Sequence, residues 1–484
     1  MQFSAIQRML GILLMVFSIA MLPPMLVSFI YLDGGFDSFL YAFAIILIAG
    51  ISIWLPVKNA RRELRLRDGF ILVVAFWLIL GFAGATPFFI SPRLDMSFTD
   101  AVFESISGLT TTGATVITGL DQLPQSILYY RQQLQWLGGL GIIVIAVAIM
   151  PMLGIGGMQL YRAGTPGPMK DSKLTPRITE TARALWYIYL SLTIGCALAY
   201  WAAGMSLFDA IGHSFSTVSI GGFSTHDASM GYFNNMPMVQ IAAIIFMLLS
   251  GINFSLHFIS WRSRNILHYL RDSEFKTYIM ILVVVSTISS AYLYYTDRFL
   301  DVGNAILSGV FQTVSIGTTS GFTTDEYYNW PGFLPALLLF TSFIGACVGS
   351  TGGGLKVMRF NLLLKQGIRE IRRLIHPNAI LSIKVGGKPL SDRVINAVWG
   401  FFAAYIAVFA IIMLILMMTG LDQISAFSAT TATINNLGPG LYAVANSYEG
   451  LENVAKWVLC FSMIIGRLEI FTLLVLFTPS FWRR

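Results

Sequence analysis

The chain carries little charge for its length. Of its 484 residues only 11% are Asp, Glu, Lys or Arg, whereas 56% are hydrophobic, and its mean hydropathy is +0.71. Because a water-soluble protein of ordinary composition carries about 25% charged residues, a soluble multidomain enzyme is excluded. The apolar runs are continuous over about 20 residues, which is the length of a membrane-spanning helix and not of a β-barrel strand. The composition therefore predicts an all-α integral membrane protein.

Cysteine and catalytic motifs are scarce as well. Cys196, Cys347 and Cys460 lie far apart within apolar stretches and form no CxxC pattern, so we expect buried thiols rather than a metal site or a disulfide. No nucleophile with an acid–base partner and no nucleotide-binding motif is evident, so the chain is predicted not to be an enzyme and to hold no organic cofactor. The net charge of +7 lies in short gaps between apolar runs, so a nucleic acid is not expected as a partner.

Ten apolar runs are long enough to cross a bilayer. They cover residues 5–29, 36–56, 69–91, 133–157, 182–204, 237–260, 276–297, 331–363, 394–419 and 454–480. Short loops that remain in the cytoplasm are rich in Lys and Arg. If both termini are cytoplasmic, only Arg93, Arg131, Arg298 and Lys456 fall on the outer side, and Arg467 lies within the last span. The sequence therefore predicts a multi-pass protein whose termini are both cytoplasmic.

Four shorter apolar segments, each ending in glycine, lie between these spans. They read DAVFESISGLTTTG (100–113), DAIGHSFSTVSIGG (209–222), SGVFQTVSIGTTSG (308–321) and SAFSATTATINNLG (425–438). Their terminal glycines are 109, 99 and 117 residues apart, which indicates structural repetition. The predicted organisation is two leading helices followed by four pseudo-fourfold span–pore segment–span repeats. The corresponding ranges are 1–68 for the leading helices and 69–181, 182–275, 276–393 and 394–484 for repeats 1 to 4, with a gate loop in repeat 3.

The glycine-ended segments could be surface helices with a C-cap glycine or re-entrant segments. Equal length, polar small residues before the glycine and an apolar character favour the re-entrant placement, in which irregular backbone lines water or is buried in protein. Backbone carbonyls can then replace the water around a monovalent cation, and glycine allows them to be exposed. The candidate filter residues are Thr110, Thr111, Thr112, Gly113, Ser219, Ile220, Gly221, Gly222, Thr318, Thr319, Ser320, Gly321, Asn435, Asn436, Leu437 and Gly438.

The run at 331–363 is interrupted by GACVGSTGGG at 345–354, a stretch that no straight helix favours, since each Gly costs about 1 kcal/mol relative to Ala. It is not a phosphate-binding P-loop, because the pattern GxxxxGK[ST] is absent. The stretch could be a flexible kink or serve close helix packing, or it could be an irregular loop that blocks or clears the path beneath the filter; we favour the gate. The candidate gate residues are Gly345, Gly349, Ser350, Thr351, Gly352, Gly353 and Gly354, together with Arg467.

Arg467 and Glu104 are the two charged residues whose positions call for partners. A cation at membrane depth costs about 2.5 kcal/mol or more unless it is paired or hydrated. Arg467 could be paired for packing alone, but we favour a position below the filter, where it would hydrogen-bond the 345–354 loop and repel cations. For Glu104, a buried hydrogen bond behind the filter is favoured over a position at the entrance.

These repeats resemble the TrkH/KtrB/HKT superfamily of potassium- and sodium-translocating proteins. The stretches HSFSTVSIGGFSTHD (213–227), GSTGGGLKVMR (349–359) and TINNLGPG (433–440) look like the bacterial TrkH branch, and the resemblance covers essentially the whole chain. Gly317 competes with Gly321 as the third filter glycine. Gly321 is preferred because the residues after it, Phe-Thr-Thr, parallel the Phe-Ser-Thr that follows Gly222.

The resemblance implies a function and partners. Glycine at all four filter positions implies potassium as the conducted ion, with sodium disfavoured, and the 345–354 loop is implied as the gate. The resemblance further implies a homodimer in the bacterial cytoplasmic (inner) membrane with a cytosolic ring of TrkA-type nucleotide-binding subunits. These subunits are expected at the inner loops 158–181, 261–276 and 365–393, although anionic membrane lipid would also explain the basic residues there. A proton- or sodium-coupled potassium symporter on the same fold remains the alternative.

Overall fold

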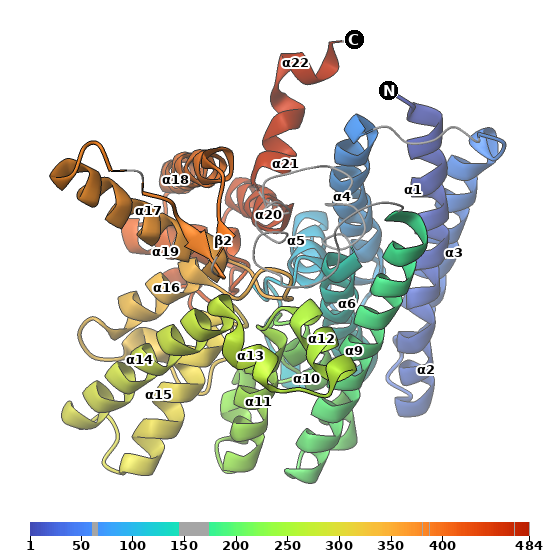
Figure 1. The fold of residues 1–484 in the computed structure, drawn as a ribbon. Helices are drawn as coiled ribbons and strands as arrows, with labels where there is room; N and C mark the ends of the chain where they lie inside the picture. The colour runs from blue at the N-terminus through green and yellow to red at the C-terminus, as the bar shows by residue number, and fades with distance from the viewer. Residues whose placement is uncertain (61–65, 145–173, 380, 387, 469, 484) are drawn as a thin grey trace.

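A computed structural model describes residues 1–484 except 61–65, 145–173, 380, 387, 469 and 484. Helices dominate the described part of the chain, as predicted, and a single small antiparallel pair of strands, β1 (Lys384–Val385) and β2 (Lys388–Pro389), is present there. The N- and C-termini lie at the same end of the molecule (Figure 1).

The helices follow the predicted order of a leading pair and four repeats. The leading part has α1 (Phe3–Ser18), η1 (Ile19–Met21), α2 (Leu22–Tyr31), α3 (Phe36–Trp54) and η2 (Leu55–Val57), and repeat 1 has α4 (Leu66–Ile90), α5 (Phe98–Leu109), η3 (Leu120–Gln122) and α6 (Gln125–Val144). Repeat 2 has α9 (Leu174–Ala202), α10 (Leu207–Val218), η5 (Ser229–Phe233), α11 (Pro237–Ser250), α12 (Phe254–Ser263) and α13 (Leu267–Arg271). Repeat 3 has α14 (Ser273–Tyr295), α15 (Val302–Gly317), η6 (Tyr327–Asn329), α16 (Leu334–Ile344) and α17 (Val357–Ile375). Repeat 4 has α18 (Asp392–Met418), α19 (Gln423–Ile434), η7 (Tyr442–Val444), α20 (Asn453–Leu468), α21 (Ile470–Leu474), η8 (Val475–Phe477) and α22 (Pro479–Trp482).

Several of these helices can cross a membrane. Among the described residues, six are long and apolar enough to do so, and up to eight if each of two bent helix pairs is one span. In one of these pairs, α11 and α12 meet at a bend of 92°. The chain is therefore a multi-pass membrane protein. The number ten stays a prediction, because the expected span 133–157 lies partly outside the described residues.

Each of the four short pore helices begins at an oxygen-bearing N-cap. Ser97 accepts from the Asp100 amide in α5, Ser206 from the Asp209 amide in α10, Asp301 from the Asn304 amide in α15, and Asp422 from the Ser425 amide in α19. Such caps satisfy amides that the first helical turn leaves unpaired. Three of the helices have 12 residues and start at matched positions, whereas α15 has 16 residues and starts four residues earlier relative to its filter segment. All four end at the candidate filter residues.

Burial separates the pore helices from the spans around them. In α5 every residue from Ala101 to Leu109 is buried, whereas the span Phe36–Val57 buries only 17% of its apolar window within the protein. In water such exposed apolar surface would be unfavourable, but lipid covers it at no comparable cost. The core of the molecule is thus the set of pore helices, and the spans shield it from the bilayer.

Candidate functional site

The four pore helices end in the same hydrogen-bonded turn. In this turn the first residue after the C-cap has a left-handed backbone, and the amide after it bonds back to the carbonyl five residues earlier, a Schellman motif. The left-handed residues are Thr111, Ile220, Thr319 and Asn436, with φ of 52°, 55°, 69° and 54°. The amides are those of Thr112, Gly221, Ser320 and Leu437, which bond at 2.9, 2.8, 2.7 and 2.7 Å. A fourfold repeat of one local geometry therefore precedes the terminal glycines.

The terminal glycines Gly113, Gly222, Gly321 and Gly438 form a closed ring with one another. Each has φ between +78° and +95°, a conformation that side chains rarely adopt. A Cβ on any of them would come within 2.7 Å or less of a carbonyl oxygen in the next repeat. The carbonyls met in this way belong, in the same order, to Gly221, Ser320, Leu437 and Thr112. Repeat 1 thus contacts repeat 2, 2 contacts 3, 3 contacts 4, and 4 contacts 1; we call this arrangement the glycine ring.

The glycine ring also distinguishes between the two candidate glycines of repeat 3. Gly317 is the last residue of α15, and a Cβ there would face the side chains of Leu282 and Thr341. Gly321 instead packs against Leu437 of repeat 4. Gly321 is therefore the structural counterpart of the other three glycines.

The 345–354 loop packs against the C-terminal ends of the pore helices. The Gly353 amide donates to Thr319 Oγ1 at 2.6 Å, and the Gly354 amide to the Asn435 carbonyl at 3.2 Å. Thr351 Oγ1 donates to the carbonyl of Val218 at 2.9 Å. The loop therefore contacts repeats 2, 3 and 4 directly beneath the glycine ring.

Glycine is required in this loop by its backbone. Gly345, Gly349 and Gly354 have φ of 69°, 75° and 75°. A Cβ on Gly353 would overlap the Asn435 carbonyl, and one on Gly345 would overlap the Gly353 carbonyl, because the loop folds back on itself. The glycine run thus serves close packing under the ring, not merely a kink in a helix.

The loop is fixed from outside by two other elements. Glu274 of α14, which is buried, accepts hydrogen bonds from the Val348 amide at 2.8 Å and the Met358 amide at 3.1 Å. In the bend between α11 and α12, the carbonyl of Gly251 accepts a hydrogen bond from the Cys347 amide at 3.0 Å. These bonds hold the loop between α14 and the α11–α12 bend on one side and the filter segments on the other.

Arg467 of α20 contacts the loop. Its Nη2 donates to the carbonyl of Thr351 at 2.9 Å, and its Nε is buried without a hydrogen-bond partner among the described residues. Lys356 Nζ donates to the carbonyl of Gly352. Two cationic side chains thus lie against the carbonyls of the loop.

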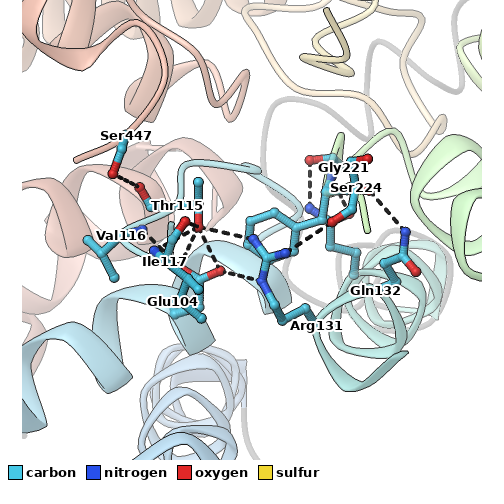
Figure 2. Close-up of polar contacts among 11 residues, drawn as sticks. Glu104, Thr115, Val116, Ile117, Arg131, Gln132, Gly221, Ser224 and Ser447 are labelled. Carbon is cyan, nitrogen blue, oxygen red and sulfur yellow. Dashed lines mark hydrogen bonds and ion pairs between the residues drawn. The ribbon is translucent and has the colours of Figure 1, made fainter. Parts of the chain in front are cut away.

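Behind the glycine ring, Arg131 joins repeats 1 and 2, and it forms a buried ion pair within repeat 1 that the sequence did not reveal (Figure 2). Arg131 Nε lies 2.7 Å from Glu104 Oε1, and both side chains are at most 1% exposed. Arg131 also donates to the Ser224 carbonyl at 3.1 Å and to Thr115 Oγ1 at 3.0 Å. The expectation that Arg131 lies in an outer loop is wrong, because α6 begins at Gln125 and carries it into the core. The expectation of a buried hydrogen bond at Glu104 is confirmed, since Glu104 also accepts from the Val116 amide at 3.0 Å.

A second basic residue assigned to the outer side is also buried. Lys456 lies in α20 with only 4% of its surface exposed, and its Nζ is 2.6 Å from Asp100 Oδ1 in α5. The predicted span 454–480 includes this position, in agreement with α20, which begins at Asn453. In both cases a carboxylate of the first pore helix supplies the partner that makes burial of the cation tolerable.

Three further contacts between neighbouring repeats use neutral groups. Asn234 of repeat 2 donates to the Thr324 carbonyl of repeat 3 at 3.0 Å. The Tyr327 hydroxyl of repeat 3 donates to the Gly440 carbonyl of repeat 4 at 2.8 Å. The Tyr448 amide of repeat 4 donates to the Thr115 carbonyl of repeat 1 at 2.8 Å. Each repeat therefore holds the segment that follows the glycine in the next one.

A titratable cluster lies on the side of the ring away from the 345–354 loop. His226 Nδ1 is 2.5 Å from Asp121 Oδ1, its Nε2 is 3.5 Å from Asp209 Oδ1, and its ring stacks on Tyr232 at 3.5 Å between centroids. Burial alone lowers the pKa of His226, but hydrogen bonds and charge attraction from the two carboxylates outweigh it and raise the pKa above its usual 6.5. This cluster also joins repeats 1 and 2.

Comparison with known proteins agrees with this geometry. Residues 36–484 match the family model TrkH, described as a cation transport protein. The "Trk system potassium uptake protein TrkH" of Vibrio parahaemolyticus is 56% identical and that of Escherichia coli (strain K12) 54% identical, each over 100% of both chains. The crystal structure of the potassium transporter TrkH from Vibrio parahaemolyticus has 54% sequence identity and a TM-score of 0.93 over 100% of both chains. The chain therefore belongs to the TrkH family of cation transport proteins and not to a family of enzymes.

Proposed function

We propose that this chain conducts potassium ions across the bacterial cytoplasmic membrane through a pore at the centre of the glycine ring. The printed names of its relatives, which are potassium uptake proteins, support potassium as the ion. The observation that carries the proposal is the closed ring itself: four glycines from four repeats, each packed on a carbonyl of the next.

In this mechanism the filter works through peptide oxygens. Four pore helices end at the ring, and the negative ends of their dipoles favour a cation there without any acidic side chain. An entering ion loses water and gains carbonyl oxygens of the candidate filter residues. Because the four filter segments are already in contact at the glycines, the ring resists contraction around a smaller ion. This rigidity favours potassium over sodium.

The proposed gate is the 345–354 loop with Arg467. The contacts of Gly353 and Gly354 with repeats 3 and 4 keep the loop on the conduction path, and the guanidinium on the Thr351 carbonyl adds a positive charge there. For an ion to pass, the loop must leave these partners. The positive charge of Arg467 repels cations most strongly where little water screens it.

The assembly we propose is a homodimer with one pore in each chain, whose termini are cytoplasmic and whose inner loops bind TrkA-type nucleotide-binding subunits. The name "Trk system" of the relatives supports a system with further components. Of the proposed docking loops, 261–276 and 365–393 are largely described, whereas most of 158–181 lies outside the described residues. Anionic lipid, the competing partner for these basic loops, would bind without any such subunit.

Purified protein in liposomes tests this function. Potassium or rubidium uptake should run down an imposed gradient, exceed sodium uptake, and need no proton gradient. Uptake that requires a proton or sodium gradient would replace conduction by symport. Equal uptake of sodium and potassium would contradict the proposed filter.

A further inference from the structure

Gln135 of α6 clamps the backbone of the second candidate filter segment at two points. Its side chain is fully buried, its Nε2 donates to the Gly221 carbonyl at 2.6 Å, and its Oε1 accepts from the Phe223 amide at 3.0 Å. One side-chain amide thus fixes the peptides on both sides of Gly222. Since the donor and the acceptor of one planar group are both used, the orientation of these peptides is set along with their position.

The same side chain explains a glycine that the ring does not require. Gly221 is not among the residues with a left-handed backbone, and its counterparts Thr112, Ser320 and Leu437 all have side chains. A Cβ at Gly221 would overlap the Gln135 amide. Position 221 is therefore glycine because the amide of Gln135 lies against its Cα. On the same helix, Gln132 occupies the space beside Gly212 of α10 in the same way.

The carbonyl that Gln135 holds is a member of the glycine ring. The missing Cβ of Gly113 points at the Gly221 oxygen, so this oxygen sets the approach of repeat 1 to repeat 2. Among the described residues, the Gly221 oxygen alone of the four ring carbonyls accepts a hydrogen bond from a side chain. A rotation of the Gly221 peptide would change both the spacing of the ring and the field that an ion meets there.

We propose that Gln135 is a specificity-determining positioning residue, which sets the discrimination between potassium and sodium by holding the Gly221 carbonyl in the ring. The inference rests on the proposed function, because it assigns to Gln135 the rigidity that the filter needs. Gln135 itself touches no ion; it acts through the peptide of Gly221.

The test measures potassium and sodium uptake by liposomes containing each variant, with the protein amount and its dimeric or monomeric elution profile matched. Gln135→Leu removes both hydrogen bonds, and we expect the potassium-to-sodium ratio to fall by about tenfold, the effect of one well-placed hydrogen bond. Gln135→Glu keeps the acceptor for the Phe223 amide but, as a carboxylate, loses the donor to the Gly221 carbonyl. The potassium-to-sodium ratio should therefore fall in this variant too, which tests the inference even if the leucine variant assembles poorly. Gln133→Leu is the matched control, since Gln133 donates to the Ala20 carbonyl in the leading hairpin and should leave the ratio unchanged.

A pair of substitutions tests the shared space directly. Gly221→Ala alone should lower the ratio, because its Cβ displaces the amide, and Gly221→Ala combined with Gln135→Ala should recover part of it, a coupling expected only between groups in contact. If the unaltered protein is selective while Gln135→Leu and Gln135→Glu keep its ratio, Gln135 has no such role and the proposed function stands. If the unaltered protein does not discriminate between the two ions, the proposed function fails and this inference fails with it.

Discussion

In the contact between repeats 1 and 2, as in the contact between repeats 3 and 4, one repeat holds the segment that follows the ring glycine of the next. The two contacts use different chemical groups. Between repeats 1 and 2, helix α6 supplies Arg131 and Gln135, and Glu104 neutralises the cation. Between repeats 3 and 4, the segment that follows the glycine is held by a neutral group, the Tyr327 hydroxyl, which donates to the Gly440 and Pro439 carbonyls. The backbone of the ring is fourfold, but its support is not.

Because of this difference, a substitution should cost more stability in one contact than in the other. A buried ion pair contributes little net stability when both partners are present, yet removal of one partner leaves an uncompensated charge that is costly. A neutral hydroxyl that is lost leaves one carbonyl without a partner, which costs less. The repeat 1–2 contact should therefore be the fragile one, and four substitutions measure how far this holds.

The largest effect is expected for Arg131→Met. This change leaves Glu104 buried without its cation, and we expect a loss of about 3–5 kcal/mol in stability, seen as a lower Tm in detergent. The control is Arg298→Met, which removes a partly exposed ion pair with Asp325 and should cost less than about 1 kcal/mol. Equal losses in the two variants would show that the buried pair is not the source of fragility.

Arg467→Ala is expected to change flux but not stability to the same degree. Arg467 of repeat 4 holds the 345–354 loop of repeat 3 and takes no part in the repeat 1–2 contact, so its removal frees the Thr351 carbonyl and takes a positive charge from the proposed path. We expect potassium flux to rise several-fold at an unchanged potassium-to-sodium ratio. Lys456→Met, in the same helix but paired with Asp100, provides the comparison. Unchanged or lower flux of Arg467→Ala at normal protein amounts would contradict the gate.

The four glycines of the ring could be predicted from the sequence, because they end four segments that recur at similar spacing along the chain. The segments have equal length, and each ends in a glycine: Gly113, Gly222, Gly321 and Gly438. The positive φ at these positions favours glycine, so this residue type marks them in the sequence. The 345–354 loop is visible for the same reason, as a glycine run inside an apolar run.

The support behind the ring is invisible in the sequence, because its partners are distant along the chain. Gln135 and Gly221 are 86 positions apart, and Arg131 and Ser224 are 93 apart. The start of α6, QSILYYRQQLQ, is polar enough to read as a loop, so the span was expected to begin at residue 133. It is polar because protein, and not lipid, surrounds this helix; the buried hydrogen bonds of its side chains replace the apolar contacts that a hydropathy pattern detects.

Tyr327→Phe measures the repeat 3–4 contact. The change removes the hydrogen bond to the Gly440 carbonyl and preserves the ring that packs in the core, so we expect a loss of about 1 kcal/mol in stability. Its matched control is Tyr328→Phe, the neighbouring residue, whose hydroxyl accepts only a long bond of 3.4 Å from Asn446. A Tm shift as large as that of Arg131→Met would remove the difference between the two contacts.

The smallest effect is expected at the outer end of the repeat 1–2 contact, where His226 lies between Asp121 and Asp209. Because the carboxylates raise the pKa of His226 above 6.5, its contribution to stability is fully present below pH 6.5 and is lost as the pH rises through the folded-state pKa. Burial alone would raise the pKa of Asp121, but its hydrogen bonds with His226 and Asp227 and the charge of His226 together outweigh burial and lower it, so the contribution of that carboxylate is lost only in strong acid. The pair is therefore most stabilising from about pH 5 to 6.5. We expect His226→Gln to lower the Tm near pH 6 by an amount equivalent to no more than about 1 kcal/mol, and to have little effect at pH 9, where the unaltered protein has lost the same charge pair. A Tm difference that is independent of pH would mean that the imidazole acts through its stacking on Tyr232 and not through its charge.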